Sequence, residues 1–418
     1  MKKFLFLFIV IFTLAAYLGV KFFWKIPQDV PLATTSKVWK IQSIDTVKYS
    51  RDLAREKLND ATFDTEIKKQ VSDIAATGAT HIALATPYND EFVPYLKRWV
   101  LEARANKLRV WFRGNVAGWE GWFEYSKVSR EEHLSQVVSF IKKYPELFED
   151  GDIFTSCPEC ENGGAGDPRM TGDVNGFRQF LIDENNQAIG AFNQINRKVA
   201  SGYYSMNGDV AELVMDEETT RALGGIVTID HYVSTPDKLI SFVDELANKS
   251  KGKIVLGEWG APIPDINGPM TEDEQAAWIE EAFDKISVNK NIVGVNYWTN
   301  RGGSTSLWND KGNPKKAVSV LTGFYTPREI SGVIENELGD AVYGATIKTR
   351  NSTGITDYAG RFRLQILPDD TVMRVEGVGY IAQTVHVTDI SNYSVTLVKQ
   401  YENGIFRFGK WLHKKFSS

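Results

Sequence analysis

Two glutamates lie shortly after apolar runs that are typical of buried β-strands. Glu159 follows Ile153-Phe154, and Glu258 follows Ile254-Val255-Leu256-Gly257. Hydrolysing a glycosidic bond with retention needs two carboxyl groups on opposite sides of one sugar, and a parallel β/α barrel places the ends of distant strands around a single mouth. The pair therefore makes this chain a candidate glycosidase.

Glu161 competes with Glu159 for the second role, because both follow the same strand. Glu159 falls closer to the strand end, whereas Glu161 lies beside Asn162 and two glycines, where a loop residue is expected. We favour Glu159. Glu258 is the stronger of the two proposed catalytic residues, because four apolar or glycine residues run directly into it.

Strand-like and helix-like segments alternate eight times between Val38 and Leu321. The expected strands are 38–41, 81–85, 108–112, 153–154, 199–204, 226–229, 254–256 and 292–297. The expected helices are 66–76, 92–105, 131–143, 177–196, 210–215, 238–247, 274–286 and 315–321. This α/β order predicts a (β/α)8 barrel, because an open doubly wound sheet would carry a Gly-rich phosphate turn after its first strand and none follows Ile44-Asp45.

The polar residues just after the strands of such a barrel should face the ligand. They are Asp45, Thr86, Arg113, Glu159, Tyr204, His231, Glu258 and Trp298. Trp119 and Trp122 follow the third strand, where a barrel keeps substrate loops. Their rings could stack on sugar faces or pack inward as a roof over the barrel.

With these residues the chain resembles the clan A glycoside hydrolases, a cellulase- and mannanase-like group, over roughly Val38 to Thr322. The resemblance implies a (β/α)8 barrel, with Glu159 as acid/base and Glu258 as nucleophile. Trp298, in Val295-Asn296-Tyr297-Trp298, would match the aromatic platform after strand eight. Tyr232, or else His231, would match the strand-six residue that holds the nucleophile.

The chain departs from this pattern at two places. Clan members carry Asn directly before the acid/base, where this chain has Pro158, and often Arg after strand two, where it has Thr86-Pro87. Recognition of the sugar 2-hydroxyl would then need other donors. Arg113 and Asn162 are the candidates.

Cys157 and Cys160 are the only cysteines of the chain, and they flank Glu159. A C-x-x-C pair can be a redox couple or half of a zinc site. No second Cys or His pair is apparent, and a local disulfide suits an exported protein better. We expect a disulfide that stiffens the acid/base loop, and no metal or cofactor.

The pattern changes after Thr326-Pro327 to short strands separated by turn residues, which predicts a small all-β sandwich over residues 328–399. Through Ile330-Ser331-Gly332-Val333, Thr356-Asp357-Tyr358-Ala359-Gly360-Arg361-Phe362 and Gly379-Tyr380, this unit resembles the carboxypeptidase regulatory-like β-sandwich. The resemblance implies an accessory or spacer module. The barrel is expected over residues 36–326.

Both ends of the chain indicate contact with a membrane. Residues 1–25 hold an uncharged, mostly apolar run, Phe4 to Val20, between lysines, and we favour an uncleaved signal anchor over a removed signal peptide. Residues 400–418 form a basic amphipathic segment that could lie on an anionic membrane surface or be a frayed tail. The body is therefore expected outside the cytoplasm, membrane-anchored or secreted.

The net charge of −5, without a long basic stripe, gives no electrostatic reason to expect a nucleic-acid partner, and eleven Trp and sixteen Tyr suit a carbohydrate ligand. The sequence thus predicts a metal-independent retaining hydrolase of β-linked poly- or oligosaccharides. Two alternatives stay open: a membrane-anchored barrel that binds glycans without cleaving them, and a structural adhesin led by the β-sandwich. The oligomeric state stays open too.

Overall fold

The computed structural model describes residues 39–116, 121–163, 166–368 and 370–400. The chain divides into two compact units. One comprises residues 37–327 with 367–369, and the described part of the other comprises residues 328–366 and 370–400.

The first unit is built on an eight-stranded parallel sheet with the strand order β4-β3-β2-β1-β8-β7-β6-β5. Its strands are β1 (Ile41–Asp45), β2 (His81–Leu84), β3 (Arg109–Phe112), β4 (Ile153–Phe154), β5 (Ser205–Asn207), β6 (Ile226–Asp230), β7 (Lys253–Trp259) and β8 (Ile292–Tyr297). A parallel bridge between Ile153 and Ala200 joins the segment before β5 to β4, with Phe154 N–H donating to the Ala200 carbonyl at 2.8 Å. The sheet therefore curls until its two edges meet.

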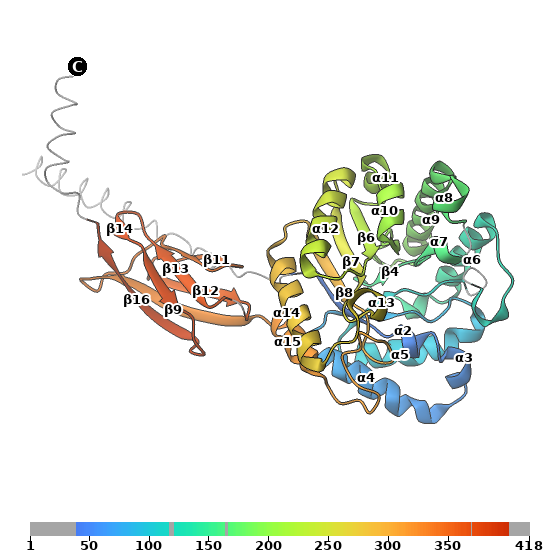
Figure 1. The fold of residues 1–418 in the computed structure, drawn as a ribbon, viewed down its shortest axis with the longest axis horizontal. Coiled ribbons are helices and arrows are strands. Elements are labelled where there is room, and N and C mark those ends of the chain that lie inside the picture. The colour runs from blue at the N-terminus through green and yellow to red at the C-terminus, as the bar shows by residue number, and fades with distance from the viewer. Residues whose placement is uncertain (1–38, 117–120, 164–165, 369, 401–418) are drawn as a thin grey trace, which may run out of the picture. The chain divides into compact units, whose positions relative to one another are not determined.

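Helices surround this sheet on its outer side (Figure 1). They are α2 (Val47–Ser50), α3 (Ala54–Lys57), α4 (Asp64–Ala76), α5 (Val93–Ala105), α6 (Arg130–Lys143), α7 (Cys160–Gly163), α8 (Pro168–Thr171), α9 (Val174–Gln194), α10 (Gly208–Val214), α11 (Glu217–Ala222), α12 (Pro236–Ser250), α13 (Pro264–Asn267), α14 (Glu272–Val288) and α15 (Lys316–Tyr325). Capping boxes begin two of them, Ser129 with Glu132 at α6 and Thr271 with Glu274 at α14, because each satisfies the free N–H groups of a first turn.

Apolar side chains on both faces hold the sheet in place. A small cluster fills its inside with Ile41, Ala83, Trp111, Ile153 and Val255, while a much larger cluster lies between its outside and the helices. Strands that are buried on both faces read as continuous apolar runs, as Ile254 to Leu256 does. This double burial is what fixes the strand ends around one mouth.

Two of the expected strands are displaced in the structure. The first begins at Ile41 rather than Val38, so Asp45 is its last residue. The fifth is Ser205–Asn207 rather than 199–204, because Gly202 has a left-handed φ of 84° and interrupts the extended run. Tyr204 therefore precedes β5 instead of following it, and its side chain is buried.

The second unit contains two four-stranded sheets, ordered β11-β10-β13-β15 and β12-β9-β16-β14. Its strands are β9 (Arg328–Asn336), β10 (Thr346–Lys348), β11 (Thr353–Ile355), β12 (Arg361–Ile366), β13 (Val372–Glu376), β14 (Tyr380–Ile381), β15 (Gln383–His386) and β16 (Asn392–Lys399). Alternate residues along β12 and β16 are buried, and they share one apolar core that includes Ile334, Phe362 and Leu397.

The expected N-terminal membrane helix (1–25) lies outside the described residues, as does the basic segment from position 401 on. Within the described ranges, no helix has the length and apolar character needed to cross a membrane.

Candidate active site

Glu258 lies near the C-terminal end of β7, and both of its carboxylate oxygens have partners. The Tyr232 hydroxyl donates to Oε2 at 2.9 Å, and Nη2 of Arg113 lies 3.1 Å from Oε1. The Glu258 side chain is 18% exposed, so it can be reached from the barrel mouth. These two partners fix the orientation of the carboxylate before any ligand arrives.

The residues that follow β6 alternate in direction, as strand geometry requires. Tyr232 reaches Glu258, whereas the His231 ring stacks on Phe242 of α12, with ring centroids 3.9 Å apart. His231 meets Glu258 only through the backbone, where its N–H donates to the Glu258 carbonyl at 2.9 Å. Of the two residues, Tyr232 is the one whose side chain contacts the Glu258 carboxylate.

Arg113 directly follows β3 and contacts residues of four other strands, β1, β5, β6 and β7. Its Nη1 donates to Asp45 Oδ2 at 2.6 Å and to the Gly257 carbonyl at 3.1 Å. Its Nη2 donates to Ser205 Oγ at 2.7 Å and to Asp230 Oδ2 at 3.1 Å. The guanidinium is 2% exposed, so it is committed to the carboxylates and is not open to a sugar hydroxyl.

Gly257 makes this close packing possible. A Cβ atom at that position would lie 2.5 Å from Asp230 Oδ1 and 3.2 Å from Ser205 Oγ. Only glycine leaves room for the two side chains of neighbouring strands. Arg113 and Glu258 were predicted at the barrel mouth from the sequence, but Asp230 and Ser205 were not.

Electrostatics in this cluster favour the protonated acids. Burial raises the pKa of Glu258 to about 7. Arg113 opposes that rise, and the charge of Glu159 adds to it. Burial holds the pKa of Asp230 well above its usual range. The charge of Glu258 adds to this rise, and Arg113 opposes it. Two of the carboxyl groups around the Arg113 guanidinium, those of Glu258 and Asp230, therefore have pKa values above their usual range.

Glu159 lies in the turn between β4 and α7 and is half-buried. Its φ of 46° is in the left-handed region, which is uncommon for a residue with a side chain, and its N–H donates to the Ser205 carbonyl at 2.7 Å. Cys157 and Cys160 form a disulfide across it, with Cα atoms 5.3 Å apart. The expected disulfide is present, and it encloses the proposed acid/base.

Glu161 points into the protein instead. Its side chain is buried, and Oε1 accepts from the Asn207 backbone N–H at 2.7 Å. Burial raises the pKa of Glu161 to about 7, and the charge of Glu159 also raises it. Asn162 is exposed, and its Oδ1 accepts from Asn207 Nδ2 at 3.4 Å. Glu159 is therefore the more accessible of the two glutamates after β4.

A buried polar network supports the Glu159 loop from behind. Ser156, directly before Cys157, donates to Glu184 Oε2 at 2.7 Å, and His133 Nδ1 lies 2.5 Å from Glu184 Oε1. The other ring nitrogen of His133 contacts Asn115 Oδ1 at 3.1 Å. This network ties the loop to α9 and α6, and nothing in the sequence pattern pointed to it.

The ring of Trp298 stands half-exposed directly after β8. The rings of Trp298 and Tyr232 meet edge-on with their centroids 5.8 Å apart. Lys48 Nζ lies 5.6 Å from the centroid of the Trp298 ring. Tyr232 thus contacts both Trp298 and Glu258. Trp119 falls outside the described residues, as does the placement of the Trp122 side chain.

The other residues expected at the mouth have structural partners. Thr86 is fully buried and donates to the Ser50 carbonyl, and the Tyr204 hydroxyl contacts Ser156 Oγ. Asn296 was missed by the sequence analysis, although it lies in the quoted run before Trp298. It donates to the Gly257 carbonyl at 2.8 Å.

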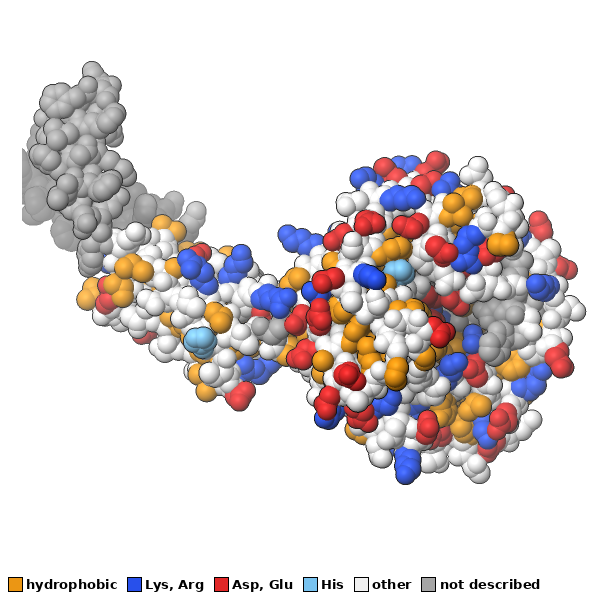
Figure 2. Space-filling view, in the orientation of Figure 1, with side chains coloured by type: hydrophobic (Ala, Val, Ile, Leu, Met, Phe, Trp, Pro, Cys, Tyr) orange, Lys and Arg blue, Asp and Glu red, His pale blue; other side chains and the backbone are white. Residues whose placement is uncertain are grey.

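No cluster of three or more His, Cys, Asp or Glu side chains suited to a metal ion occurs in the part of the chain that is described. On the barrel face drawn in Figure 2, acidic and basic side chains are interspersed.

Comparisons with known proteins agree on the fold. No protein-family model matches the chain, and no curated protein matches it. Among solved structures it is similar to GH5_18 from Bifidobacterium longum subsp. longum, at 14% identity over 72% of this chain and 85% of that one, with a TM-score of 0.51. A variant of that protein in complex with Manb1-4GlcNAc matches at 12% identity, over 72% of this chain and 84% of that one, with a TM-score of 0.51. The match to Bacteroides uniformis beta-glucuronidase 2 has 9% identity and a TM-score of 0.49. It covers 86% of this chain but only 47% of that protein. The likeness to GH5_18 shows that the first unit has the fold of such barrels.

Proposed function

We propose that the protein is a retaining glycoside hydrolase that cleaves β-linked poly- or oligosaccharides. The observation that carries the proposal is the carboxylate of Glu258, which Tyr232 and Arg113 hold from two sides and whose pKa the charge of the half-buried Glu159 raises. Retaining glycosidases need such a pair of carboxyl groups on either side of one bond. The barrel fold shared with GH5_18 supports the same reading.

In the first step the ionised Glu258 attacks the anomeric carbon. The bond from that carbon to the leaving oxygen breaks, and the proton of Glu159 moves to that oxygen, so that a glycosyl ester forms on Glu258. Burial and the charge of Glu159 raise the pKa of Glu258 to about 7, so Glu258 must lose its proton before it can attack.

In the second step Glu159, now ionised, takes a proton from water. The water oxygen bonds to the anomeric carbon, and Glu258 leaves as a carboxylate that Arg113 and Tyr232 stabilise. Trp298 would support the sugar ring, because its half-exposed face lies beside Tyr232. No metal ion or cofactor is needed in this scheme.

One observation favours the second candidate, a barrel that binds glycans without cleaving them. Pro158 stands where clan A enzymes have Asn, so the donor that would recognise the sugar 2-hydroxyl is missing from that position. Arg113 does not replace it, because the guanidinium is occupied by carboxylates.

Purified protein and its Glu258→Gln variant should be assayed on aryl β-glycosides and on β-linked polysaccharides, with Glu131→Gln, an exposed change on α6, as the control. We expect turnover by the wild-type and control proteins and a loss of about 10³-fold or more in Glu258→Gln. Glycan binding without hydrolysis by the wild-type protein would favour the non-catalytic barrel. An inverted product by NMR would contradict the retaining mechanism.

We further propose that the protein acts outside the cytoplasm, tethered by residues 1–25, and that the all-β unit serves as an accessory module or spacer. The apolar run between lysines and the Cys157–Cys160 disulfide support this location. Fractionation of cells expressing the full chain should place it with membranes, and deletion of residues 1–25 should release it from them. Unchanged membrane association after the deletion would contradict the anchor.

A further inference from the structure

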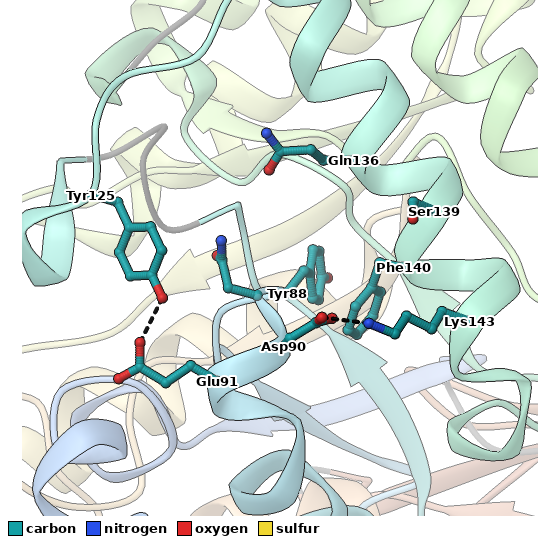
Figure 3. A pocket seen from close by; sticks show the side chains of 9 residues that line it. Tyr88, Asp90, Glu91, Tyr125, Gln136, Ser139, Phe140 and Lys143 are labelled. Carbon is teal, nitrogen blue, oxygen red and sulfur yellow. Dashed lines mark hydrogen bonds and ion pairs between the residues drawn. The ribbon is translucent and has the colours of Figure 1, made fainter.

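A cavity of about 340 Å³ lies away from Glu258, on the side of the barrel where the loop after β2 meets helix α6 (Figure 3). It is lined by residues 88–91 of that loop, by Tyr125, and by Gln136, Ser139, Phe140 and Lys143 of α6. None of the residues that contact Glu258 contributes to it. Its volume is in the range of small-molecule sites in proteins.

The floor of the cavity is aromatic and rigid. Tyr88 stacks on Phe140 with centroids 4.7 Å apart, and both side chains are buried. The Tyr88 hydroxyl donates to the Thr155 carbonyl at 2.7 Å, which fixes the ring against β4. A floor held in this way does not collapse to fill the space above it.

The charges around the cavity neutralise each other. Asp90 pairs with Lys143 and accepts from the Tyr144 hydroxyl at 2.7 Å. Glu91 accepts from Arg55 Nε at 2.8 Å. These cations lower the pKa of both acids, so each stays ionised beside its partner. With two anions and two cations, the walls offer no net charge to an ionic ligand.

Neutral hydrogen-bonding groups face the same space. The Gln136 amide and the Ser139 hydroxyl lie on the cavity side of α6 (Figure 3), and neither forms a hydrogen bond with another residue that the structure describes. The Tyr125 hydroxyl is held by Glu91 Oε2 at 2.5 Å, which fixes its ring as a wall. Amide, hydroxyl and fixed carboxylate groups together provide both donors and acceptors.

We propose that this cavity binds one or two rings of a neutral carbohydrate, as an accessory glycan site separate from Glu258. A sugar presents hydroxyl groups around its rim, which match the donors and acceptors of the walls, and a cavity of about 340 Å³ has room for it. The choice of sugar as the ligand class rests on the proposed function of the barrel. An anionic ligand would meet Asp90 and Glu91 without a free cation between them.

The test uses Ser139→Trp, which would fill the cavity from an exposed position without removing a core contact. Ser135→Trp is the matched control, since Ser135 is exposed on the same helix but does not line the cavity. Both changes are made in the full-length Glu258→Gln protein so that the probes are not cleaved. The probes are Manβ1-4GlcNAc, cellotetraose and mannotetraose, titrated by calorimetry.

We expect two binding sites for at least one probe, of which Ser139→Trp removes one and Ser135→Trp none, while Trp298→Ala weakens the other. Gln136→Leu should weaken the accessory site by about tenfold, because it keeps the size but removes the amide. Unchanged binding in Ser139→Trp, or no binding of any probe, overturns the accessory site. If Ser139→Trp removes a binding site but the wild-type protein hydrolyses nothing, the accessory site stands and the proposed enzymatic function fails.

Discussion

The Tyr232 hydroxyl donates a hydrogen bond of 2.9 Å to Oε2 of Glu258, and the two residues come from the neighbouring strand ends β6 and β7. This bond favours the ionised form of Glu258 and so lowers the pKa of the carboxyl, against the larger effect of burial. It therefore links the geometry of the proposed nucleophile to the pH at which it can act.

Removing that hydroxyl in Tyr232→Phe should raise the pKa of Glu258. The acidic limb of the kcat/KM profile should then move to higher pH, and kcat should fall by about 10- to 100-fold. Tyr203→Phe is the control, because Tyr203 packs on Trp111 away from this carboxylate. A loss of activity without a shift of the pH profile would show that Tyr232 acts on packing alone.

Glu258→Gln should change how stability depends on pH. The pKa of Glu258 is about 7 in the folded protein, against 4.5 for the free side chain. Between these values the folded protein holds a proton that the unfolded chain has lost, so this group lowers the free energy of unfolding as the pH rises. The difference corresponds to about 3 kcal/mol at most.

The variant cannot ionise at this position, so its Tm should exceed that of the wild-type protein at pH 8 and approach it at pH 4. Thermal unfolding followed by circular dichroism at several pH values measures the difference. A constant difference in Tm across this range would contradict the raised pKa.

Glu159→Ala should lose hydrolysis of substrates with poor leaving groups but keep part of its activity on activated aryl glycosides. Added azide should restore turnover, because a small anion can take the place of the missing carboxylate. The same assay on Glu161→Ala is the comparison. Azide rescue there, and not in Glu159→Ala, would assign the acid/base role to Glu161.

Asp230 and Asp45 should respond differently to replacement by Asn. Burial raises the pKa of Asp230 and so favours its protonated form, and the neutral Asn of Asp230→Asn should therefore change less of its charge. Asp45 accepts from Arg113 at 2.6 Å, and Asp45→Asn would leave the buried guanidinium with one partner fewer. We expect a loss of about 10²- to 10³-fold in kcat/KM for Asp45→Asn and at least tenfold less for Asp230→Asn. Equal losses would contradict the raised pKa of Asp230.

The double change Cys157→Ser and Cys160→Ser should lower kcat more than it lowers Tm. The disulfide closes only a short loop, so it restricts the unfolded chain little, yet it encloses Glu159 with its left-handed φ of 46°. Steady-state kinetics and thermal unfolding separate the two effects. A large fall in Tm with unchanged kcat would show a purely structural bond.

The order of the strands and helices was predictable from the sequence alone, whereas the catalytic roles of Glu159 and Glu258 stay a prediction. Apolar runs such as Ile254 to Leu256 are continuous because parallel strands are buried on both faces, and this pattern is local enough to read without a structure. It also placed Glu258 at a strand end and Cys157 beside Cys160. The strand boundaries were less accurate, because Gly202 and its left-handed φ decide where β5 begins.

Which side chains meet at the barrel mouth depends on the tertiary structure. The residues around Arg113 come from separate strands: Asp45 from β1, Ser205 from β5 and Asp230 from β6, while Arg113 itself follows β3. No regular spacing in the sequence relates these four positions. They converge because the curled sheet brings its strand ends together and because Gly257 leaves room for them. The choice between Tyr232 and His231 likewise depends on which face of one strand end meets Glu258, a matter of register that adjacent residues in a sequence cannot show.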